Sequence, residues 1–529
     1  MKGTMALKRI KNTFNLIIIV FLAIAAIAVF VASFLKTIYY DMHIDVDFPH
    51  YKSETITHLL LSMAVVFIFF LILYKKNLLN NSKIYVILAL IFCAAYCITL
   101  VLSIKPLPVD DSKLIDDVLL EIEEGNYSSL TGAGGYLYTW PFQLGYVFFG
   151  QLMDRFFGHG NYFAWDIVQL ISILVTVYVL YQITWELFED RKICSIAALL
   201  SMGMLFFYNY VTYIYGDILS MGPQTVALYL IILYIKREKK AYVLWSAPFI
   251  ALAVLLKTNC EITLIAMVML LLLSSGKRKD DENGYASYEL IKRIFTRVIL
   301  SAVIIAVVFA AKWGIDEYYC RAAGIDEIPG GSPSVSHIAM GLQESELEDG
   351  WYNGYNYHVF AENDYDTEKT KAAAIENIKE RLTYFAENPK YALKFMARKF
   401  LTQWSDSVCI STHNLDLVSR HVENPTELMY YIVFGSGSII LRWIMNVFMS
   451  VCYLCVIIYL ISRLRRRGSS VTNQEMLLLI LIFGGILFHQ FWEGSSRYAM
   501  RYYVYWLPYA ACGMEAILRS LTDVRKRAK

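Results

Sequence analysis

Two adjacent carboxylates stand where an apolar segment ends. Asp110 and Asp111 lie in KPLPVDDSKL, after two prolines and before a short amphipathic segment. A hydroxyl is a poor nucleophile at neutral pH, and a carboxylate within hydrogen-bonding distance can remove its proton as the new bond forms. Acids at a membrane boundary are costly to keep and therefore indicate function. The alternative is a solvated turn that caps a helix starting near Ser112.

A third acid, Asp217, follows two tyrosines in YVTYIYGDILS and precedes an apolar run. It could hold a divalent cation such as Mg²⁺ or Mn²⁺ together with Asp111, or orient a sugar hydroxyl. Asp after Gly and before an apolar run is also typical of a helix N-cap. A catalytic role and a capping role are both consistent with this pattern.

The segment KTNCEITL interrupts a long apolar run with Lys257, Asn259 and Glu261. One interpretation is a polar hinge between two spans, in which Lys257 and Glu261 pair four residues apart on a helix. The other is that Lys257 contacts a phosphate. We expect both charged residues to belong to a substrate-binding region.

The segment WEGSSRYAMRYY contains Glu493, Arg497 and Arg501. The two arginines are one helical turn apart, and a guanidinium can bind a phosphate through two parallel hydrogen bonds. Glu493 and lipid headgroups are the alternative partners. We predict that these residues bind the phosphate of a substrate.

Aromatic and polar side chains gather in the loop-rich sequence after residue 329. His337 and Trp351, with Asn353 and Tyr355, could line a sugar site because aromatic rings stack on sugar faces. A surface loop with satisfied side chains is the plainer alternative.

The composition predicts the environment in which these residues work. Of the 529 residues, 57% are hydrophobic and 18% are charged, which is typical of an all-α polytopic membrane protein. No basic domain suggests a nucleic-acid partner, and no nucleotide-binding glycine loop or zinc spacing is present.

Apolar runs long enough to cross a membrane predict about 12 to 13 transmembrane helices. We expect them at residues 14–35, 57–74, 84–104, 140–157, 161–184, 193–210, 217–235, 241–256, 259–275, 295–311, 438–462, 475–491 and 501–519. If all of them cross, the basic residues at 191–192 lie on the external side of the membrane, against the usual preference of basic residues for the cytoplasmic side. We therefore predict that 140–157 is interfacial or re-entrant.

Basic clusters favour the cytoplasmic side of a membrane. They stand near both ends of the chain and at residues 75–83, 236–240, 277–279 and 463–467. This pattern predicts cytoplasmic N- and C-termini in a plasma-membrane protein. Alternating the spans then puts all the polar segments described above on the external face.

Three parts follow from this topology. Residues 1–311 form an N-terminal transmembrane module that includes an external loop, 105–139, with its own helix. Residues 312–437 form a small, mostly helical external domain, with one helix after Asp366 and another after Asn388 that begins with Pro389. Residues 438–529 supply the C-terminal transmembrane helices.

Several of these segments together resemble a known group of enzymes. PLPVDD, GNYSSL, YTWPFQLGYVFFGQLMDRFFG, the later YGD and the closing WEGSSRY are similar to the GT-C superfamily of membrane glycosyltransferases. The closest similarity is to its protein O-mannosyltransferase and aminoarabinose-transferase groups. The chain departs from these at Thr139 and Trp140, where related transferases often carry an acid.

The resemblance implies transfer of a sugar from a polyprenyl-phosphate donor to an extracytoplasmic acceptor, with inversion. It implies that Asp110 or Asp111 is the general base, that Asp217 is the second acid and that Arg497 is the late-span arginine. The acceptor could be a cell-wall polymer, a glycolipid or a protein. Two other functions remain open: a transporter or flippase of lipid-linked saccharides, which should show inverted repeats, and a noncatalytic partner in cell-envelope synthesis.

Overall fold

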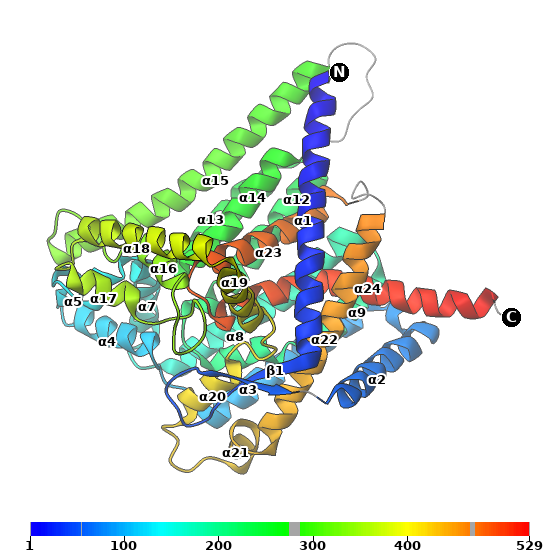
Figure 1. The fold of residues 1–529 in the computed structure, drawn as a ribbon, viewed down its shortest axis with the longest axis horizontal. Coiled ribbons are helices and arrows are strands. Elements are labelled where there is room, and N and C mark those ends of the chain that lie inside the picture. Colours follow the sequence, from blue (N-terminus) through cyan, green and yellow to red (C-terminus); the bar gives the residue numbers. More distant parts are fainter. Residues whose placement is uncertain (1, 54, 275–285, 466–470, 528–529) are drawn as a thin grey trace.

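The protein is an assembly of helices with one short β-hairpin (Figure 1), seen here in a computed structural model. The structure describes residues 2–53, 55–274, 286–465 and 471–527. The basic residues at 277–279 and 466–467, which contributed to the predicted orientation, lie outside the described residues.

Eight helical segments in the described ranges are long and apolar enough to cross a membrane. They lie in α1 (Lys2–Leu35), α2 (Ile56–Lys75), α3 (Ser82–Ile104), α8 (Tyr162–Phe188), α11 with α12 (Gly216–Leu219 and Met221–Arg237), α15 (Ala286–Ala323), α22 (Ser436–Arg465) and α23 (Asn473–Phe491). A ninth candidate is bent by 50° and joins α9 (Arg191–Ser201) to α10 (Leu205–Asn209) and η3 (Tyr210–Thr212). The predicted all-α polytopic membrane protein is confirmed.

Four expected spans do not meet this criterion. Two of them, α13 (Lys240–Leu256) and α14 (Glu261–Leu273), are too short because the polar turn η4 (Thr258–Cys260) separates them. A third, α7 (Leu144–Phe157), has only 14 residues, and its interfacial placement stays a prediction. The fourth, α24 (Ser496–Arg527), is long but rich in tyrosine and charge. The described residues therefore contain fewer full-length spans than the sequence predicts, mainly because polar residues interrupt the apolar runs.

The predicted external loop contains more than one helix. Here α4 (Asp111–Glu123) is followed by α5 (Ser128–Thr131), α6 (Tyr136–Thr139) and η2 (Pro141–Gln143). The apolar face of α4 buries Ile115, Val118, Leu119 and Ile122. Leu119 packs so closely on Gly150 of α7 that a Cβ there would approach its Cδ1 to 2.6 Å. This packing fixes the start of α4, where Asp110 and Asp111 lie.

The segment between the first two long helices forms an antiparallel hairpin, β1 (Lys36–Tyr40) paired with β2 (Pro49–Ser53). Its loop is held by α20 (Ser411–Ser419) and by Arg420, which follows that helix. The backbone amide of His43 donates to Asp416 at 2.8 Å, and Arg420 donates to the Ile44 carbonyl at 2.5 Å and pairs with Asp45. The hairpin loop is therefore anchored against residues more than 370 positions away.

The predicted external domain is helical. It contains α16 (Ser334–Gly341), α17 (Tyr355–Glu362), α18 (Thr367–Glu387), α19 (Pro389–Trp404), α20 (Ser411–Ser419) and α21 (Glu427–Val433). As predicted, Asp366 caps α18 and Pro389 begins α19. The boundary expected at residue 311 lies inside α15, which continues to Ala323. The starts of α1 and α15 meet at one end of the molecule, with α20 and α21 at the other (Figure 1).

Candidate active site

A cavity of about 1810 Å³ lies where the predicted external segments meet. Its wall is formed by the β1–β2 loop, the start of α4, the α6–η2 turn, the turn before α11, the η4 hinge, the loops around α16 and the segment before α24. Eight of the ten predicted site residues line it: Asp110, Asp111, Lys257, Glu261, His337, Trp351, Glu493 and Arg497. Tertiary packing thus collects residues that are up to 387 positions apart in the chain (Asp110 to Arg497).

Asp110 faces the cavity and does not cap a helix through its side chain. It occupies the N-cap position of α4 with a φ of 50°, and its side chain makes no capping hydrogen bond. The nearby Ser112 hydroxyl accepts from the Val109 amide, which precedes the helix, at 2.9 Å. Burial raises the pKa of Asp110, Arg497 lowers it and the neighbouring Asp111 raises it. The capping interpretation of Asp110 is therefore wrong, and its carboxylate is available to a ligand.

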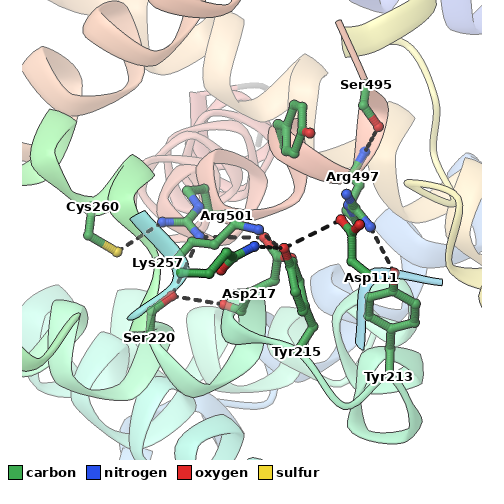
Figure 2. Close-up of polar contacts among 12 residues, drawn as sticks. Asp111, Tyr213, Tyr215, Asp217, Ser220, Lys257, Cys260, Ser495, Arg497 and Arg501 are labelled. Atoms are coloured by element: carbon green, nitrogen blue, oxygen red, sulfur yellow. Dashed lines mark hydrogen bonds and ion pairs between the residues drawn. The ribbon is translucent and has the colours of Figure 1, made fainter. Parts of the chain in front are cut away.

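The second carboxylate, Asp111, is held by tyrosine. The Tyr215 hydroxyl lies 3.5 Å from Asp111 Oδ2 (Figure 2). It receives a hydrogen bond of 2.5 Å from the Gln143 side chain. Because the Gln143 amide donates to Tyr215, the Tyr215 proton is directed at Asp111. This chain orients the carboxylate toward the cavity.

Arg497 brings a positive charge to the wall without a carboxylate partner. Its Nη1 donates to the Tyr213 hydroxyl at 2.9 Å, and the rings of Tyr213, Tyr215 and Tyr498 lie 5.5 to 5.8 Å from the guanidinium carbon. Within the described ranges no acid lies within 4.0 Å of this guanidinium, and the buried Nε has no hydrogen-bond partner. The alternative pairing with Glu493 is therefore absent from the described structure, and the Arg497 guanidinium can bind an anion.

Asp217 and Arg501 lie beneath the wall and do not belong to the residues that line the cavity. Asp217 Oδ2 is 3.2 Å from Lys257 Nζ, and Oδ1 is 3.7 Å from Arg501 Nη2 (Figure 2). Arg501 also donates to Gln224 and to the Cys260 sulfur, both at 3.1 Å. The geometry supports a structural role for this cluster and gives no direct contact with substrate.

The expected N-cap role of Asp217 is also wrong. Tyr215 occupies the N-cap position of α11, and Asp217 is the second helical residue. Its carboxylate instead pairs with cations from two other helical regions. The expectation that Asp111 and Asp217 share a metal ion lacks support for the same reason, because Asp217 is already paired with two cations. No group of three or more His, Cys, Asp or Glu side chains in the described part of the chain is arranged to hold a metal ion.

The hinge at Lys257 is confirmed, but its internal ion pair is not. Lys257 pairs with Asp217 and lies 4.1 Å from the centre of the Tyr215 ring, whereas Glu261 pairs with Lys312 at 3.0 Å. The hinge breaks the helix between these two residues, so they do not share a helical face. Lys257 still lines the cavity and can add positive potential near Arg497.

Three further predicted residues form an aromatic and acidic part of the wall. His337 stacks on Trp492 at 4.8 Å and contacts the Asn356 amide at 3.1 Å. Burial lowers the pKa of His337 to about 4, so this imidazole is neutral at physiological pH. Burial raises the pKa of Glu493 to about 7, despite the opposing effect of Arg497. Trp351 is 1% exposed and forms a β-bridge with Gly494.

The sequence analysis missed two groups of acids in the wall, Asp45 and Asp47 in the hairpin loop and Glu344 and Glu346 after α16. Burial raises the pKa of Asp47 to about 6, while Arg497 lowers it and Asp110 raises it. A signal was available, because the loop after the first apolar segment reads DMHIDVDF and the predicted topology puts it on the external face.

Residues 144–285 match the family of dolichyl-phosphate-mannose-protein mannosyltransferases. This match confirms the predicted resemblance to the GT-C superfamily. The GT-C-like segment begins at α7 and includes the turn before α11, Asp217 and the Lys257 hinge. No curated protein sequence matches this chain.

Two solved structures share a distant similarity with the GT-C-like chain. One is the archaeal oligosaccharyltransferase AglB from Archaeoglobus fulgidus in complex with an inhibitory peptide and a dolichol-phosphate, at 16% identity and a TM-score of 0.41. The other is the A. fulgidus oligosaccharyltransferase tethered to an acceptor peptide, at 15% identity and the same TM-score. Each alignment covers 84% of this chain and 51% of the other, so the chain spans about half the length of these structures.

Proposed function

We propose that this protein transfers a sugar from a polyprenyl-phosphate donor to an acceptor hydroxyl on the external side of the membrane. One observation carries the proposal: Arg497, a cation without a carboxylate partner in the described structure, lines the same cavity as Asp110 and Asp111. An anion-binding group and a general base facing one space are what such a transfer requires. The match to a family named for a dolichyl-phosphate sugar donor supports it.

The proposed reaction is a single displacement. The donor phosphate binds Arg497, with Lys257 adding positive potential. The acceptor oxygen attacks the anomeric carbon as the bond from that carbon to the phosphate oxygen breaks. The acceptor proton moves to a carboxylate, and polyprenyl phosphate leaves with the bonding electrons. Attack opposite the leaving group inverts the anomeric configuration, and phosphate is a good enough leaving group to need no acid.

Asp110 is our candidate for the base. It faces the cavity, and its side chain makes no capping hydrogen bond. Its raised pKa makes it a stronger base than an ordinary aspartate. Asp111 is tied to Tyr215 and orients the acceptor in this scheme. We assign no step to a divalent cation, since Asp217 is neutralised by Lys257 and Arg501.

We place the reaction at the outer face of the plasma membrane, with both termini in the cytoplasm. The support is the distribution of Lys and Arg along the sequence. The acceptor belongs to one of three classes, a cell-wall polymer, a glycolipid or a protein.

The decisive experiment measures transfer of a radiolabelled sugar from a short-chain polyprenyl-phosphate donor by the purified protein in lipid nanodiscs. Asp110→Asn should abolish transfer while donor still binds, and Arg497→Ala should weaken donor binding. Matched controls are Asp117→Asn on the exposed face of α4 and Arg321→Ala at the exposed end of α15, which should behave like wild type. Full transfer by Asp110→Asn and Asp111→Asn would overturn the mechanism, and donor translocation without transfer would favour the flippase.

A further inference from the structure

The cavity wall has an excess of negative charge. Some of its acids are paired: Glu261 with Lys312, Glu344 with Arg381 at 3.4 Å, and Asp45 with Arg420. Within the residues that the structure describes, five other wall carboxylates have no cation within 4.0 Å. They are Asp47, Asp110, Asp111, Glu346 and Glu493. Glu493, with its pKa raised to about 7 by burial, is only partly ionised at neutral pH.

The wall offers few positive charges to balance these acids. Lys257 and Lys312 are already engaged by Asp217 and Glu261. Burial lowers the pKa of His337 and of His413, so both imidazoles are neutral at physiological pH. Among the lysines and arginines of the described wall residues, Arg497 is the remaining one, and the proposed function gives it to the donor phosphate. Once the donor is bound, an incoming acceptor meets carboxylates.

Two buried N–H groups of wall residues have no hydrogen-bond partner among the described residues. Trp351 is 1% exposed and His337 is 8% exposed, both line the cavity, and Trp351 Nε1 and His337 Nδ1 have no hydrogen-bond partner. Since the Asn356 amide nitrogen faces His337 Nε2, that nitrogen accepts and Nδ1 carries the proton. Two neutral N–H donors of wall residues therefore lack an acceptor, which is rare for buried polar groups.

We infer that the acceptor is an uncharged or cationic hydroxyl compound and that polyanionic acceptors, such as phosphate-linked polymers, are rejected. This inference rests on the proposed function, because it takes Arg497 as occupied by the donor. Unpaired carboxylates in a partly enclosed space attract cations and repel anions. Neutral N–H donors hold an uncharged oxygen without requiring a charge on the acceptor.

The test uses three soluble glycosides of the same size that end in a trimethylammonium, a tert-butyl or a sulfonate group. Their affinities are measured by calorimetry on the full-length protein in neutral-lipid nanodiscs, saturated with short-chain polyprenyl phosphate. We expect the cation to bind most tightly and the anion most weakly, with roughly tenfold between successive probes at low salt. The differences should shrink as salt is raised.

A double variant, Asp47→Asn with Glu346→Gln, should bring the three affinities closer together without weakening polyprenyl phosphate binding. Asp117→Asn with Glu387→Gln removes the same charge from exposed positions outside the wall and should leave the order unchanged. If the double variant does not fold, Glu346→Gln alone serves, since this side chain is exposed in a loop.

The outcomes separate the two proposals. Failure of polyprenyl phosphate to bind, or binding that Arg497→Ala leaves unchanged, rejects the proposed function before any acceptor is tested. With donor phosphate bound, equal affinities for the three probes, preference for the sulfonate, no binding of any probe, or affinity differences that the double variant does not reduce each overturns the inference about the acceptor.

Discussion

Lys257 Nζ lies 3.2 Å from Asp217 Oδ2, and both side chains are largely buried, with 13% and 2% exposure. Asp217 also faces Arg501 at 3.7 Å, so one carboxylate serves two cations. The pair joins α11 to the hinge between α13 and α14. It therefore fixes one side of the cavity without contributing a reacting group.

This arrangement predicts unequal costs when one partner is removed. Asp217→Asn leaves two buried cations uncompensated and should destabilise the fold by about 3–5 kcal/mol. Lys257→Met should cost less, because Arg501 still balances Asp217. Thermal unfolding in detergent, followed by intrinsic fluorescence, measures the difference. The double variant should be more stable than Asp217→Asn alone, and a Lys257→Met protein that unfolds first would contradict this account.

Arg497 should control affinity for the donor phosphate. Arg497→Ala removes a charged hydrogen-bond donor worth about 1.5–3 kcal/mol, so affinity should fall by roughly tenfold to a hundredfold. Arg497→Lys should recover part of the loss, because a lysine keeps the charge but not the planar fork. Calorimetric titration with short-chain polyprenyl phosphate reports both values. An unchanged dissociation constant in Arg497→Ala would place the phosphate elsewhere.

Asp110 should set the acidic limb of the pH–rate profile. A base must be deprotonated, so the rate should fall as the pH drops through the raised pKa of Asp110. Removing the like charge of Asp111 lowers that pKa, so the limb should move to lower pH in Asp111→Asn. Initial rates at saturating donor between pH 4 and 8 test this. A limb that moves to higher pH, or that persists in the residual activity of Asp110→Asn, would assign it to another group.

Glu493 should make the folded protein less stable above pH 7 than below pH 4.5. Burial raises its pKa from the ordinary 4.5 to about 7, so the folded state favours the protonated form, and stability is lost as the pH rises from about 4.5 to 7. Glu493→Gln removes this loss. The variant should match wild type below pH 4.5 and exceed it above pH 7 by about 1–3 kcal/mol, allowing for partial exposure. A pH series of melting temperatures measures it, and a variant that is less stable at pH 8 would show that the charged form is favoured.

Local patterns in the sequence determined the helices and their limits. Asp366 and Pro389 predicted two helix starts because capping bonds and the fixed φ of proline depend on adjacent residues alone. The polar break at Lys257 predicted the hinge for the same reason. Most of the predicted site residues also line one cavity. This agrees with the prediction, made from the basic residues, that their segments share one face of the membrane.

Only the tertiary structure decided which charges meet. Lys257 pairs with Asp217, 40 positions away, and not with the nearby Glu261. Arg497 and Arg501 are one helical turn apart, yet one lines the cavity and the other is buried with Asp217. Asp47 reaches the wall because α20 anchors its hairpin. Such pairings depend on how distant segments pack, and the spacing of residues along the chain carries no information about that packing.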